Sequence, residues 1–130
     1  RDREGRHDLL AIISQVQSLV QDVRWQDLFS SKAKAEIPIA AVVGETVITG
    51  RIDRLLVDEH YVRIVDFKTS RRVPKDVAGV NLSELRQMAH YVAAVERIFP
   101  GRKVSAALLY THAPLMMELP LQAFAPHKPV

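Results

Sequence analysis

The sequence predicts an α/β fold in which a mixed central sheet is flanked by helices, in the order helix, three strands, helix, two strands. An early segment repeats apolar residues at helical intervals. Three segments rich in Val and Ile follow, joined by turns so short that an antiparallel meander is favoured. A helix start signal and two further strand-like segments complete the pattern.

The first predicted helix runs from His7 to Val23 and carries a stripe of apolar residues at three- and four-residue spacing. The three following strands are expected over Ala35–Val43, Thr46–Val57 and Tyr61–Lys68. Turn residues separate them at 44–45 and 58–60. These boundaries define the meander.

The second half of the chain begins with a basic loop, 69–79, that has no apolar period. Asn81 lies three residues before Glu84, which predicts the start of a helix running to about residue 98, where Pro100 and Gly101 stop it. Strands are expected over 103–111 and 115–119. From Ala123 the prolines are regularly spaced, and a loose tail is expected.

The chain has the size of a single domain, because 130 residues with 48% apolar content can bury one core. Within it we expect a helical segment over 1–30, a core over 34–120 and a loose tail over 121–130. It opens without Met and without an apolar signal region, so we interpret it as a fragment of a longer protein. Its apolar runs are too short to cross a bilayer.

Composition excludes several kinds of site. No cysteine is present, which rules out disulfides, thiolate catalysis, iron–sulfur clusters and thiolate zinc sites within this chain. A cytoplasmic location is compatible with this and is expected. The net charge of +3 would mildly favour a polyanionic partner.

The most informative feature is a pair of aspartates on neighbouring strands. If Val57 pairs with Val62 across the turn, Asp53 lies directly opposite Asp66. Two carboxylates beside an aliphatic patch repel each other, and a divalent hard cation such as Mg²⁺ or Mn²⁺ would relieve this repulsion. By strand alternation, the face that holds Asp53 also holds Leu55, Val57, Val62, Ile64, Asp66 and Lys68.

Lys68 would add a positive charge on the same face, suited to offsetting charge that develops during phosphodiester cleavage. An ordinary solvated Asp–Lys ion pair is an equally simple interpretation, and the facing aspartates depend on the assumed register. From spacing alone, both interpretations stay open.

Three motifs in a fixed order resemble a known nuclease signature: Gly50-Arg51-Ile52-Asp53-Arg54-Leu55, then Val65-Asp66-Phe67-Lys68-Thr69, then Gln87-Met88-Ala89-His90-Tyr91. The chain is similar to the RecB family of the PD-(D/E)XK superfamily, and most similar to the carboxy-terminal nuclease domain of AddA-type helicase-nucleases. The resemblance implies a restriction-endonuclease-like core and Mg²⁺-dependent hydrolysis of DNA, of the exonuclease type, in double-strand break repair and recombination. The partners it implies are DNA, the helicase part of the chain and an AddB-like subunit.

The same resemblance implies roles for individual residues. Asp53 and Asp66 would bind the metal together with the main-chain carbonyl of Phe67, and Lys68 would position or activate the attacking water. Gln87 and Tyr91 match a QxxxY element that lies beside the active site in the family and helps to hold the DNA or the catalytic residues.

The sequence also departs from the family. A further metal ligand normally lies on an early helix, and we expect that helix to lie outside this fragment. Glu36 matches a position that is often acidic but receives no role. A catalytically incomplete module that binds DNA or docks a partner, and a stand-alone exonuclease, remain as alternatives. Sequence-independent phosphate contacts are expected from flanking basic residues, namely Arg51, Arg54, Arg71, Arg72 and Lys75.

Overall fold

The structure, a computed structural model, describes residue 27 and residues 32–129. Five strands form one sheet in the order β1-β2-β3-β4-β5. Only the β3–β4 contact is parallel, so the sheet is mixed, as expected. The strands are β1 (Ala33–Val43), β2 (Thr46–Val57), β3 (Tyr61–Lys68), β4 (Lys103–Tyr110) and β5 (Leu115–Leu119).

The register between β2 and β3 is the one that the turn predicts. Val57 pairs with Val62, and the ladder continues in step to Arg54 and Val65. Asp53 and Asp66 are the next residues along the two strands, beyond the last pair. The register therefore brings the two carboxylates to the same end of the hairpin.

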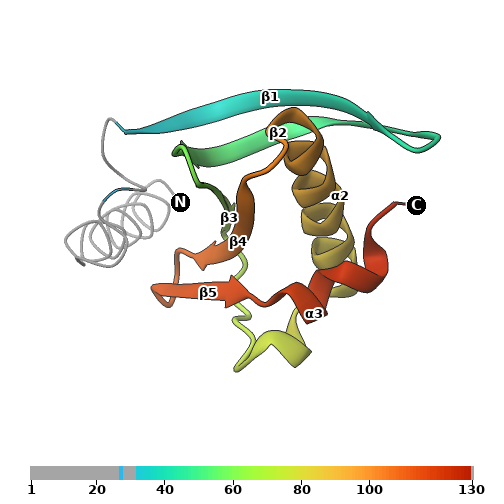
Figure 1. The fold of residues 1–130 in the computed structure, drawn as a ribbon. Helices are drawn as coiled ribbons and strands as arrows, with labels where there is room; N and C mark the ends of the chain where they lie inside the picture. Colours follow the sequence, from blue (N-terminus) through green and yellow to red (C-terminus); the bar gives the residue numbers. More distant parts are fainter. Residues whose placement is uncertain (1–26, 28–31, 130) are drawn as a thin grey trace.

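The crossover between the parallel strands β3 and β4 runs through α2 (Leu82–Ile98), which lies across one side of the sheet (Figure 1). Asn81 caps the helix as predicted, because its side chain accepts a hydrogen bond from Ser83 N over 2.8 Å. The helix ends where the Phe99 N–H donates to the Val95 carbonyl. Both boundaries agree with the sequence signals.

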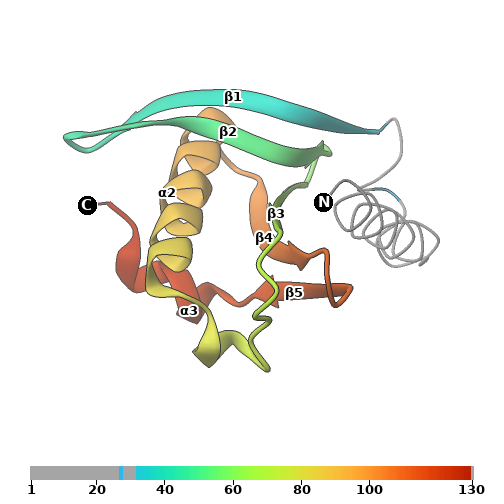
Figure 2. The ribbon, with the colours of Figure 1, turned by 180° about the vertical axis from the view of Figure 1, so that it is seen from behind.

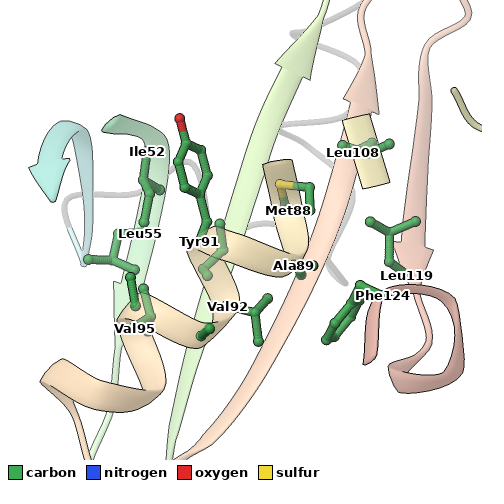
Figure 3. Close-up of a cluster of buried hydrophobic side chains, with 14 of the residues drawn as sticks. Ile52, Leu55, Met88, Ala89, Tyr91, Val92, Val95, Leu108, Leu119 and Phe124 are labelled. Atoms are coloured by element: carbon green, nitrogen blue, oxygen red, sulfur yellow. The ribbon is translucent and has the colours of Figure 1, made fainter. Parts of the chain in front are cut away.

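The main core lies between α2 and the sheet. Met88, Ala89, Val92 and Val95 on the helix are buried against residues of β1, β2, β3 and β4 (Figure 3). Each fully buried Met or Val side chain of this kind contributes about 1.5–3 kcal/mol. A smaller cluster on the other face contains Ala33, Leu56, Val65, Ala107 and Leu109. The sheet thus presents buried apolar surface on both faces.

The strict alternation of side chains between the two faces of the sheet fails at one point on β2, next to Asp53. Ile52 and Leu55 both join the cluster under α2, although they are three residues apart (Figure 3). On β1 the residue between the pairs Ala35–Arg54 and Ile37–Ile52 is Glu36, which has φ 51°. On both β1 and β2, the alternation of side chains between the two sheet faces therefore shifts at the same position along the strands. Asp53 lies at that position.

The end of the chain differs from the loose tail expected over 121–130. Residues Leu121–Phe124 form α3, and Ala125–His127 form the 3-10 turn η3. Phe124 is only 2% exposed and belongs to the main core. Lys128 Nζ lies 2.7 Å from Glu96 Oε1 on α2. Figure 2 shows α3 beside α2, with the end of the chain turning back along the helix. The expectation was wrong because short proline-flanked turns leave no periodic signal.

Two further expectations concern other segments. The predicted basic loop after β3 contains one short 3-10 turn, η2 (Val77–Gly79), capped by the side chain of Asp76. The first predicted helix, 7–23, lies outside the described residues. In residues 32–129, no helix is long and apolar enough to span a membrane.

Candidate active site

Asp66 lies near the end of β3 and is mostly enclosed. Its side chain is 11% exposed, and Lys68 Nζ approaches its Oδ2 to 2.7 Å. The side chain of Lys68 is itself only 15% exposed. The pair is therefore not the solvated surface ion pair that the spacing alone left open, since exposed pairs of that kind contribute little.

Asp53 is held by the main chain of the neighbouring strand. Its Oδ2 accepts a hydrogen bond from the Phe67 N–H over 2.7 Å. This bond continues the contact between β2 and β3 just past their last main-chain pair, Arg54 and Val65. The Asp53 carboxylate is thus fixed in orientation beside Asp66.

The two carboxyl groups influence each other. Burial, together with the hydrogen bond and charge of Asp53, raises the pKa of Asp66 from 3.8 to about 6, while Lys68 acts in the opposite direction. Full ionisation of Asp66 therefore requires more positive charge nearby than Lys68 alone supplies. A second cation beside the two carboxylates would provide it.

Glu84, in the first turn of α2, is a neighbour of the site that the sequence does not reveal. Its Oε1 lies 3.9 Å from Lys68 Nζ, so Lys68 lies between two carboxylates, Asp66 and Glu84. The spacing of Glu84 to Gln87 and Tyr91 places all three along one side of the helix, and this pattern is the only sequence signal for it.

Gln87 and Tyr91 lie side by side on that helix. Gln87 Nε2 donates a hydrogen bond to Tyr91 Oη over 3.3 Å. Tyr91 packs on Gly50 of β2, where an added Cβ would lie 2.5 Å from its hydroxyl oxygen. Figure 3 shows Tyr91 extending from α2 beside Ile52. Tyr91 thus contacts the strand that carries Asp53, three residues before that aspartate.

The five basic residues are spread along two segments. Arg51 is exposed on β2 and Arg54 is half-buried there, whereas Arg71, Arg72 and Lys75 are exposed on the loop after β3. Arg72 lines a pocket together with Ser70, Glu84 and Tyr110. Basic residues therefore lie both on the strand that carries Asp53 and on the loop that follows Lys68.

The donor set suits a hard cation. Asp53 and Asp66 offer carboxylate oxygens from two fixed strands, and Mg²⁺ commonly takes only one or two protein carboxylates, completing its shell with water and substrate phosphate. Among the described residues, no group of three or more His, Cys, Asp or Glu side chains forms a larger metal cluster. The two aspartates are thus the protein side chains that would hold the ion.

Comparison with known proteins agrees with this architecture. The family model described as the PD-(D/E)XK nuclease superfamily matches residues 2–128. No curated protein matches the chain significantly. A solved structure titled "Crystal structure of SSO0001" has a similar fold, with a TM-score of 0.51 and 18% sequence identity over 86% of this chain.

The chain covers 48% of the SSO0001 structure, so it spans about half the length of that protein. At this level of identity the likeness concerns the fold alone. The family match, in contrast, extends over almost every residue, and the mixed sheet with its helices has the restriction-endonuclease-like α/β arrangement. The chain belongs to the PD-(D/E)XK nuclease superfamily.

Proposed function

We propose that this domain hydrolyses phosphodiester bonds of DNA with Mg²⁺ or Mn²⁺ held by Asp53 and Asp66. One observation carries the proposal: two carboxylates that interact directly, with a nearly buried lysine 2.7 Å from one of them. The main-chain carbonyl of Phe67 is proposed as a third ligand, since the N–H of the same residue already holds Asp53. Burial of unpaired like charges is costly unless a cation compensates it.

Each protein group has a defined part in this reaction. A bound divalent ion lowers the pKa of a coordinated water and polarises the phosphoryl oxygen. Lys68 supplies an ammonium group beside the attacked phosphorus and stabilises the negative charge that develops there. Asp53, fixed by the Phe67 N–H, keeps its oxygen oriented without needing to reorganise. Glu84, whose Oε1 lies 3.9 Å from Lys68 Nζ, would help to hold the ammonium group in place.

Residues around the centre would hold the DNA strand. Gln87 and Tyr91 form a hydrogen-bonded pair, and Tyr91 packs against β2. The pair would support β2, which carries Asp53, or contact the DNA itself. Arg51, Arg54, Arg71, Arg72 and Lys75 would contact phosphates without regard to sequence.

The wider setting is proposed from the motif resemblance. It favours an exonuclease domain of a cytoplasmic helicase-nuclease that processes double-strand breaks and acts with an AddB-like subunit. In that setting the motor would deliver DNA to the Asp53–Asp66 face. The family match supports the nuclease part of this proposal.

A cleavage assay tests the proposal. End-labelled single- and double-stranded DNA is incubated with the protein and Mg²⁺ or Mn²⁺, and with EDTA as the metal-free control. Lys68→Gln should lower the cleavage rate by about 10²–10³-fold, the usual loss for one stabilising group. Lys103→Gln, at the opposite end of the parallel β3–β4 pair, is the matched control and should cut normally.

DNA binding without metal-dependent cleavage in the wild-type protein would instead favour the alternative function, a binding or docking module of the same fold. Cleavage that persists in Lys68→Gln would remove the proposed role of that lysine.

A further inference from the structure

A pocket of about 340 Å³ opens next to the candidate active site. It lies between the loop after β3, the end of β4 and the first turn of α2. Its size falls near the lower end of the range for small-molecule sites, about 300–1000 Å³. Its lining includes Ser70, Arg72 and Pro74 from the loop, Asn81 and Glu84 from the start of the helix, and Tyr110 from β4.

The hydroxyl of Tyr110 is the unusual group in this pocket. The residue is 2% exposed, and in the described part of the chain its Oη is buried without a hydrogen-bond partner. Burying such a group costs roughly 1–3 kcal/mol relative to a satisfied one. Most buried hydroxyls are hydrogen-bonded, and Tyr110 is one of the residues that line this pocket, so a ligand atom in the pocket is a natural partner for its hydroxyl.

The polar and charged groups of the pocket indicate the class of ligand that would fit it. Burial and the charge of Glu84 raise the pKa of Tyr110 to about 12, so the phenol stays protonated and can donate a hydrogen bond. Glu84 is an acceptor, and exposed Arg72 supplies positive charge at the same pocket. A nucleotide combines these features, because its base offers both donors and acceptors and its phosphate is anionic.

The position of the pocket agrees with this ligand. Glu84, which lines it, lies 3.9 Å from Lys68, and Lys68 forms a cross-strand pair with Tyr110. A nucleotide covalently joined to a phosphate at Lys68 would therefore reach the pocket directly. A base can enter only when it is unstacked from its neighbours, as in a single strand or a frayed end.

We propose that this pocket binds one unstacked nucleotide of single-stranded DNA beside the phosphate that is cut, with the Tyr110 hydroxyl donating to the base and Arg72 facing a phosphate. This inference rests on the proposed nuclease function for its orientation. The binding itself does not require metal, so it can be tested separately.

Tyr110→Phe is the decisive variant, because it removes only the oxygen of a side chain whose ring belongs to the core. Binding of thymidine monophosphate and of single-stranded oligothymidylate is measured in EDTA, where no cleavage occurs. The variant should bind both about five- to tenfold more weakly, the usual loss of one hydrogen bond. Its thermal stability should be unchanged or higher, since the hydroxyl has no partner in the free protein. Tyr61→Phe, on the other face of the sheet, is the control and should change neither quantity.

Three results would overturn the proposal. The first is equal nucleotide affinity in wild-type protein and Tyr110→Phe, or no binding to either. The second is a loss of stability in the variant, which would mean that the hydroxyl already has a protein partner. The third is competition by inorganic phosphate as effective as that of thymidine monophosphate, which would reduce the site to an anion site. Failure of Mg²⁺-dependent cleavage with normal Tyr110-dependent binding would instead overturn only the nuclease proposal.

Discussion

At the scale of single residues, the account depends on Asp66 and its neighbours. The carboxyl group is enclosed, lies against a second carboxyl and is paired with one lysine. Its ionised form is therefore disfavoured in the folded protein when no metal is present. The stability of the folded protein should therefore depend on pH through this one side chain.

The pH dependence has a definite sign. Folding raises the pKa of Asp66 from 3.8 to about 6, so the folded state holds this proton more tightly than the unfolded state. Stability in EDTA should then fall as the pH rises from about 4 to 6. Asp66→Asn, which cannot ionise, should be more stable than wild type above pH 6, and its advantage should vanish near pH 4. Urea unfolding at several pH values measures this, and a wild-type protein that gains stability relative to the variant over this interval would contradict it.

Gly50 gives a second prediction at this scale. A Cβ there would lie 2.5 Å from the Tyr91 hydroxyl oxygen and 2.6 Å from its Cε1, so Gly50→Ala forces a buried ring to move. We expect a loss of about 1–3 kcal/mol in the free energy of unfolding. In a Tyr91→Ala background the same change should cost much less, because the obstructing ring is gone. Equal costs in both backgrounds would mean that helix and strand do not meet at this point.

At the scale of elements, the sequence predicted the strands and the second helix well. Val57 and Val62 flank a short turn, and a short turn determines register, so the approach of Asp53 to Asp66 followed from spacing. The cap at Asn81 was visible because capping residues have fixed offsets. Both features could be predicted because they depend only on residues that are close together in the sequence.

Other features could not be predicted because they depend on contacts between distant segments. The approach of Glu84 to Lys68 depends on how α2 crosses the sheet. The hydrogen bond from Phe67 to Asp53 and the change of face at Glu36 depend on how the strands β1, β2 and β3 twist together. The unpartnered hydroxyl of Tyr110 depends on the surrounding loop. Apart from the helical spacing of Glu84, Gln87 and Tyr91, these features leave no pattern in the sequence.

The carboxy-terminal turn, which was expected to be loose, gives a prediction for an element. Phe124 is 2% exposed, so Phe124→Ala should lower the free energy of unfolding by about 3–5 kcal/mol. Leu121 in the same short helix α3 is 60% exposed, and Leu121→Ala should change the free energy of unfolding by no more than about 0.5 kcal/mol. Denaturant unfolding compares the two. Similar small effects would mean that this turn does not contribute to the core.

At the scale of the whole molecule, charge placement should govern DNA binding. The net charge is only +3, so affinity should depend on where the basic residues lie. Lys75→Gln, in the loop beyond β3, should weaken DNA binding and lower the magnitude of the slope of log affinity against log salt by about 1. Lys103→Gln, at the other end of the parallel pair, should leave the slope unchanged. Equal slopes for all three proteins would exclude a phosphate contact at Lys75.

The central claim is that the Asp53–Asp66 face holds a divalent cation, and calorimetric titration of Mn²⁺ tests it most directly. The wild-type protein is compared with Asp66→Asn, which keeps the size of the side chain and removes its charge. The account predicts saturable binding to the wild type that is abolished, or weakened at least about tenfold, in the variant. Equal Mn²⁺ binding by both proteins, or binding by neither, would contradict it.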